Sequence, residues 1–163
     1  MTRFALIIAG LLALGSPAMA QKLGQTIDVG GWKVTMDKNK DGSTGCSAMF
    51  VYDDKSIIGF TVDNDDTHMF LVSEPAAKMK EGQQTPITYR VDRLGTFSGV
   101  GIAASPTMLV VPITANYDKV YSAFMAGNTL FIKLGGEEFE EPLDGSSKAI
   151  SALSACQDNL PKR

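Results

Sequence analysis

The stretch that decides the fold is residues 32–62, WKVTMDKNKDGSTGCSAMFVYDDKSIIGFTV. Apolar and polar side chains alternate over 32–36, which is the pattern of a strand with one buried face, and we expect Trp32 to lie in the core. The same period returns over 46–52 and is followed by an apolar run at 56–62. Polar segments rich in Asp, Lys and Gly separate these runs. Strands joined by short turns are usually adjacent and antiparallel, so the stretch predicts a β-meander.

The pattern beyond residue 62 predicts further strands and three helices. The strand segments are 69–72, 87–91, 97–103, 108–113 and 130–134. Apolar residues recur at helical spacing over 117–126, before Gly127, and again over 147–156. Pro75 can occupy the first turn of a short central helix that ends near Met79. The sequence therefore predicts a mainly β (α+β) fold, an antiparallel β sandwich or barrel with these three helices.

The first twenty residues have the features of a cleaved signal peptide. Arg3 precedes an apolar run of export length, and Ala18 and Ala20 form the small-residue pattern that signal peptidase cuts. Cleavage leaves 143 of the 163 residues and removes one positive charge, so the net charge of −3 becomes −4. We expect a single β-rich domain over 21–163, with 157–163 as a solvated tail, in the periplasm or secreted.

The composition of the mature chain argues against nucleic-acid binding and against a membrane span. A mildly acidic domain lacks the basic surface that binds nucleic acid. It also lacks a second long apolar stretch, so we expect no membrane span in the mature form.

The two cysteines, Cys46 and Cys156, are predicted to form a disulfide. The alternative is two free thiols, and a metal site is disfavoured because only His68 is available to join them. A bridge would close a loop of about 110 residues and stabilise the fold by about 4–5 kcal/mol. It would fasten the C-terminal helix to the strand that carries Cys46, in a compartment where disulfides persist.

One segment contains half of a calcium-binding loop. Asp37, Asn39 and Asp41, followed by Gly42, place oxygen ligands at alternating positions before a sharp turn. The twelfth position is Ala48, where an EF-hand has a bidentate Glu. The sequence therefore favours a solvated turn, with a weak calcium site as the alternative, and predicts no other metal or cofactor.

No constellation of residues predicts catalysis. The acidic turn 63–66 lies beside His68, the single histidine, but nothing places that imidazole next to a nucleophile. Ser98 lacks the first glycine of a nucleophile elbow. Glutamates surround Phe139 in the segment 137–141, and we interpret them as a hydrated sheet edge that discourages aggregation. We therefore expect no catalytic residue and no enzyme.

Four short motifs resemble a family of exported proteobacterial proteins. They are GWKV at 31–34, the SII at 56–58 after Cys46, FMAGNTL at 124–130 and LDGSSKA at 143–149. Together with the signal peptide, they are similar to the invasion-associated protein B family. The resemblance implies an exported, β-rich, non-enzymatic protein, in some relatives associated with host-cell entry, and it supplies no catalytic residues.

These observations favour an exported, non-enzymatic envelope or secreted protein that acts by protein–protein contact, with an unidentified protein partner and a host interaction as one option. The alternative is an inhibitor of a secreted or periplasmic hydrolase, a protease or lysozyme, because a small rigid fold loses little entropy on binding. Such an inhibitor would need a protruding loop, for which 37–45 and 63–67 are the candidates. A third class is a small-ligand carrier with a cavity near Phe124.

Overall fold

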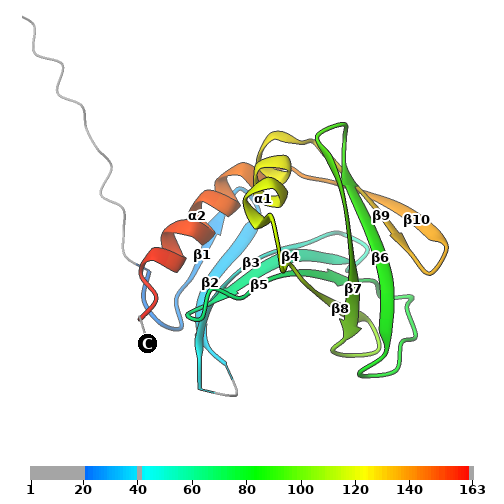
Figure 1. Ribbon diagram of the computed structural model, residues 1–163. Coiled ribbons are helices and arrows are strands. Elements are labelled where there is room, and N and C mark those ends of the chain that lie inside the picture. Colours follow the sequence, from blue (N-terminus) through cyan, green and yellow to red (C-terminus); the bar gives the residue numbers. More distant parts are fainter. Residues whose placement is uncertain (1–20, 40–41, 162–163) are drawn as a thin grey trace, which may run out of the picture.

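The computed structural model describes residues 21–39 and 42–161, which form ten strands and two helices (Figure 1). The strands are β1 (Thr26–Val29), β2 (Trp32–Lys38), β3 (Thr44–Val51), β4 (Ile57–Asp63), β5 (His68–Ser73), β6 (Gln84–Val91), β7 (Gly95–Ala103), β8 (Met108–Pro112), β9 (Thr129–Leu134) and β10 (Glu137–Pro142). The helices are α1 (Tyr117–Ala126) and α2 (Ser146–Asp158). The predicted signal peptide, 1–20, lies outside the described residues.

All ten strands belong to one antiparallel sheet of order β1-β2-β3-β4-β5-β8-β7-β6-β9-β10. Short turns connect β1 to β5 as a meander, as the alternating pattern predicts, and the strands β6–β8 return in reverse order. The sheet curves strongly, and the two helices lie together on one side of it (Figure 1). Because β1 and β10 stand at opposite ends of the strand order, the sheet is not closed, and the barrel alternative is wrong.

The inner face of the sheet and the helices enclose the core. Phe60 from β4 and Phe70 from β5 meet Phe124 from α1, with ring centroids 4.8 and 5.6 Å from it. Tyr89 from β6 continues this cluster at 4.7 Å from Phe70. Trp32 is fully buried, as predicted, and donates from Nε1 to the Asp144 carbonyl oxygen just before α2.

The predicted disulfide holds α2 against the sheet. Cys46 of β3 and Cys156 of α2 are bonded, with their Cα atoms 6.1 Å apart. At the other end of α2, Gly145 approaches Gly30 so closely that a Cβ at Gly145 would lie 2.2 Å from the Gly30 carbonyl oxygen. Both ends of α2 are therefore tied to the β1–β3 part of the sheet.

The mainly β fold and both long helices are confirmed, but the short central helix is wrong. Residues 75–79 form a turn and an extended segment. The Met79 amide donates to the Pro106 carbonyl oxygen, and the Glu74 amide donates to that of Thr107. A helix would need local acceptors, whereas these amides bond to the β7–β8 connection.

The solvated tail at 157–163 is also corrected within the described residues. Helix α2 continues through Asp158, and Leu160 is only 8% exposed as part of the hydrophobic core. The tail has one strongly apolar side chain, and burying it outweighs the solvation of its polar neighbours. Within the residues described, no helix has the length and apolar character needed to cross a membrane.

Candidate functional site

The partial calcium loop lies in the β2–β3 hairpin. The Asn39 side chain donates to the Ser43 hydroxyl, and its backbone amide donates to the Ser43 carbonyl oxygen, as in an ordinary closed turn. Asp37 belongs to β2 and lies opposite Gly45, while Asp41 falls outside the described residues. Among the residues that the structure describes, no group of three His, Cys, Asp or Glu side chains could hold a metal. A calcium site at this turn stays a prediction.

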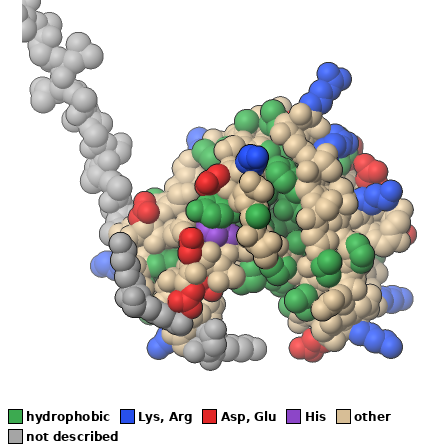
Figure 2. All heavy atoms as spheres, viewed as in Figure 1, with side chains coloured by type: hydrophobic (Ala, Val, Ile, Leu, Met, Phe, Trp, Pro, Cys, Tyr) green, Lys and Arg blue, Asp and Glu red, His purple; other side chains and the backbone are tan. Residues whose placement is uncertain are grey.

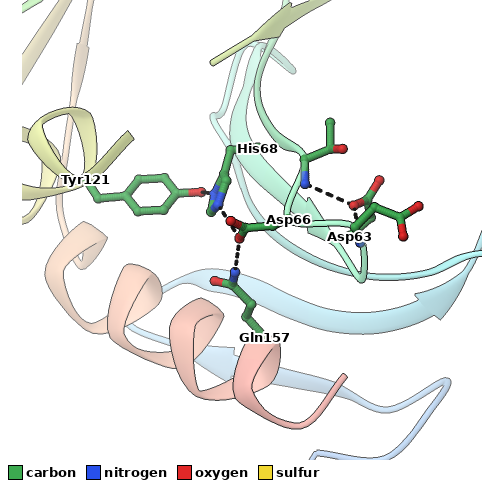
Figure 3. Close-up of polar contacts among 7 residues, drawn as sticks. Asp63, Asp66, His68, Tyr121 and Gln157 are labelled. Carbon is green, nitrogen blue, oxygen red and sulfur yellow. Dashed lines mark hydrogen bonds and ion pairs between the residues drawn. The ribbon is translucent and has the colours of Figure 1, made fainter. Parts of the chain in front are cut away.

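The exposed acidic turn after β4 forms a polar cluster with the buried His68 (Figure 3). His68 is 3% exposed; its Nδ1 lies 2.8 Å from the Tyr121 hydroxyl and its Nε2 lies 3.0 Å from Asp66 Oδ1. Tyr117 stacks on the imidazole with ring centroids 3.9 Å apart. Gln157 Nε2 donates to the same Asp66 oxygen at 2.7 Å. The cluster thus joins β5, α1 and the end of α2.

The contacts of Asp66, His68 and Tyr121 have the acid–imidazole–hydroxyl order of a nucleophilic relay. Burial raises the pKa of the Tyr121 phenol, and the negative charge of Asp66 raises it further. A phenol with a raised pKa stays protonated, so the Tyr121 hydroxyl acts here as a neutral hydrogen-bond partner of the imidazole. The same contacts join helix α1, through Tyr121, and helix α2, through Gln157, to the edge of β5.

A second carboxylate of this turn, that of Asp63, accepts hydrogen bonds from the backbone. Asp63 Oδ1 accepts hydrogen bonds from the amides of Asp65 and Thr67, at 2.9 and 3.0 Å (Figure 3). Since Asp66 in the same turn contacts His68 and Gln157, the segment 63–67 is fastened to the domain. These bonds hold the exposed turn in one conformation, and its use as an inhibitory loop stays a prediction.

A buried acid lies on the edge strand β10, in the segment predicted to be a hydrated sheet edge. Glu141 is 8% exposed and accepts a hydrogen bond from the Ser56 hydroxyl at 3.0 Å. Burial raises the pKa of Glu141, and the Ser56 bond opposes this rise. Phe139 and Glu141 are two residues apart, and this spacing predicts that both side chains lie on the same face of the strand. The spacing could not show that this face is covered.

The outer face of the sheet, opposite the helices, carries an apolar row across five strands. The strand registers align Met49 with Gly59, Gly59 with Leu71, Leu71 with Val110, and Val110 with Ile102. We call these five residues the outer row. Along it, Ile102 is 43% exposed, Met49 and Val110 are half-buried, and Leu71 is 6% exposed. No helix of the described chain covers this row (Figure 1).

A hollow of about 450 Å³ adjoins the outer row. Met69, Leu71 and Val110 contribute apolar lining, and the β2–β3 hairpin borders it. The Thr61 hydroxyl faces this region and is buried without a hydrogen-bond partner in the described part of the chain. The centre of the outer row has no side chain, because it is Gly59. A Cβ at this position would lie 2.7 Å from the Ala48 carbonyl oxygen, so a larger residue does not fit without a shift of the backbone. The hollow therefore combines apolar surface with one unsatisfied hydroxyl, which suits a contact site.

The other residues considered for function lie in structural positions. Ser98 is an exposed residue of β7 whose hydroxyl lies 3.2 Å from that of Thr88. Phe124 and Leu130 are fully buried in the aromatic core, at the place proposed for a ligand carrier.

Comparisons with known proteins agree with the family resemblance at the level of the fold. No family model matches the chain, and a search of curated proteins finds no match. The crystal structure of invasion associated protein B from Bartonella henselae superposes with a TM-score of 0.51. The fold resembles that of invasion associated protein B. The two chains are 19% identical, over 82% of this chain and 99% of that one, so the likeness concerns the fold alone.

Proposed function

We propose that this protein is exported and acts without catalysis, by binding another protein through the outer row and its hollow. The observation that carries the proposal is the register itself, which lines up Met49, Leu71, Val110 and Ile102 on the face that no helix covers. Partly exposed apolar side chains on an uncovered sheet face, beside a hollow with polar and apolar lining, supply the kind of surface on which proteins dock. The sheet holds the row rigid, so little conformational entropy is lost on binding.

Export rests on two features of the chain. The first twenty residues carry the signal-peptide pattern, and the Cys46–Cys156 bridge is of a kind that persists outside the reducing cytosol. A partner in the cell envelope or the surrounding medium follows from that location. The name of the similar structure, invasion associated protein B, extends the search to host-cell surfaces.

The test is affinity capture from envelope and host-cell extracts with the oxidised protein. A charged double variant, Ile102→Lys with Val110→Lys, disrupts the outer row at exposed or half-buried positions. The matched control, Ser147→Lys with Ser154→Lys, places the same charges on the exposed side of α2. We expect both the wild type and the control to retain one partner, and the row variant to lose it by tenfold or more.

A photo-crosslinking residue locates the contact. Placed at Ile102 it should cross-link the captured partner, and placed at Ser154 it should not. Equal capture by the row variant, or cross-links from position 154 alone, would refute the outer row as the binding face. A reproducible failure of the oxidised wild type to retain any partner would refute the proposed function.

A further inference from the structure

The sheet is split between β7 and β8. These strands pair only through Ile102↔Val110 and Ala103↔Leu109, although β7 extends back to Gly95. The continuation of the register would place Val100 opposite Pro112, and proline has no amide hydrogen to donate to a neighbouring strand. From this point β8 leads toward α1 while β7 stays with β6, and the two diverge (Figure 1).

The split leaves one edge of β7 unpaired. The Ala103 amide bonds to Gln83 on the β6 side, and the Ala104 amide bonds to Met108 on the β8 side. Because backbone groups of a strand alternate in direction, the amides and carbonyls of Thr96, Ser98 and Val100 point toward the split. The groups of Thr96 and Ser98 therefore stand along this edge with no strand of the described chain paired beside them, and Pro112 offers the Val100 carbonyl no donor.

A cleft of about 610 Å³ lies at this edge, between β7 and the start of α1. Hydrophobic side chains are visible at the bottom of the depression between α1 and the strands beside it (Figure 2). Phe97, Val111 and Val120 supply apolar lining, and Lys119 stands at the rim. Tyr89 also lines the cleft and is 3% exposed.

We propose that the cleft binds an extended peptide segment of the partner protein, which adds a strand to the free edge of β7. The backbone groups of Thr96, Ser98 and Val100 are spaced two residues apart along the strand. Only an extended peptide backbone offers donors and acceptors at the same spacing. Its inward side chains, apolar at alternate positions, contact the cleft lining, and a polar atom reaches the Tyr89 hydroxyl. An acidic group of the segment pairs with Lys119. This inference rests on the proposed function, since it specifies how part of the protein partner is held.

The test uses a synthetic peptide, acetyl-TVTVTVD-amide, and amide hydrogen exchange of the oxidised protein followed by NMR. In the free protein, the amides of Ser98 and Val100 should exchange quickly, whereas those of Phe97 and Gly99, which face β6, should be protected. Saturating peptide should slow exchange at Ser98 and Val100 by about tenfold or more and leave Phe97 and Gly99 unchanged. The same peptide with N-methyl groups on alternate amides should not produce this protection.

A variant of the protein, in place of a modified peptide, tests the same edge of β7. Val100→Pro removes a donor that faces the split and leaves the β6 ladder intact, so peptide affinity should fall by at least about fivefold. Val100→Thr, which keeps the amide, should bind as the wild type does. Should the proline variant fail to fold, the N-methylated peptide still tests the pairing, because it leaves the protein unaltered.

The proposal is overturned by an absence of peptide binding, by equal binding of the N-methylated peptide, or by protection that does not alternate along β7. If partner capture through Ile102 is intact, such a result would refute the added strand and would not refute the proposed function. Alternating protection with no capture at the outer row would refute the outer row alone.

Discussion

Removal of the Cys46–Cys156 bridge should be the most costly covalent change to this fold. The bridge joins residues 110 positions apart, and loop-closure entropy for that separation corresponds to about 4.8 kcal/mol of stability at 25 °C. Domains of this size are typically stable by only about 5–15 kcal/mol. A variant without the bridge, Cys46→Ala with Cys156→Ala, should therefore be marginally folded, and α2 should be the first element to detach.

The assay is urea unfolding of the wild type, the two single alanine variants and the double variant. Each single variant already breaks the cross-link, so each should lose about 4–5 kcal/mol, and the double variant should lose only slightly more. The slope of free energy against urea should rise in all three, because the uncrosslinked unfolded chain exposes more surface. A loss below about 2 kcal/mol in the single variants would refute the reasoning that the bridge constrains the unfolded chain.

Three further predictions concern the buried polar groups and the outer row. Tyr121→Phe removes the hydroxyl beside His68 and should lower the unfolding free energy by about 1–2 kcal/mol in chemical denaturation. Burial raises the pKa of Glu141, so ionisation of its carboxyl destabilises the fold as pH rises above about 4.5, and Glu141→Gln should raise Tm at pH 7–8 but not at pH 4. The control is Glu140→Gln, at an exposed neighbour, which should change Tm at neither pH. A rise in Tm at pH 4 for Glu141→Gln would contradict the argument. Gly59→Ala forces a Cβ against a neighbouring carbonyl and should cost about 1–3 kcal/mol by the same measurement; an unchanged midpoint would show that the sheet yields there.

Sequence reasoning worked where the physical cause is local. The period-two pattern of 32–36 and 46–52 depends only on which face of a strand is buried, and both segments are strands. The helical spacing before Gly127 predicts helix α1 with its observed bounds. It failed over 75–79, where local propensity favours a helix but the Met79 amide donates to the carbonyl oxygen of Pro106, 27 residues further along the chain. Nonlocal hydrogen bonds of this kind leave no trace in a short window.

By itself, the sequence determined the class of the fold, the alternation of buried and exposed strand positions, and the cysteine pair that closes the domain. Only the tertiary structure decided which strands meet. The outer row exists because the registers of five strands align its residues. Glu141 is buried because the face of the edge strand β10 that carries it is covered by other parts of the fold. Pro112 is visible in the sequence, but its effect depends on the strand that lies opposite. Strand order and register are set by packing across the whole sheet, and that is why the candidate surface and the split edge appeared only in three dimensions.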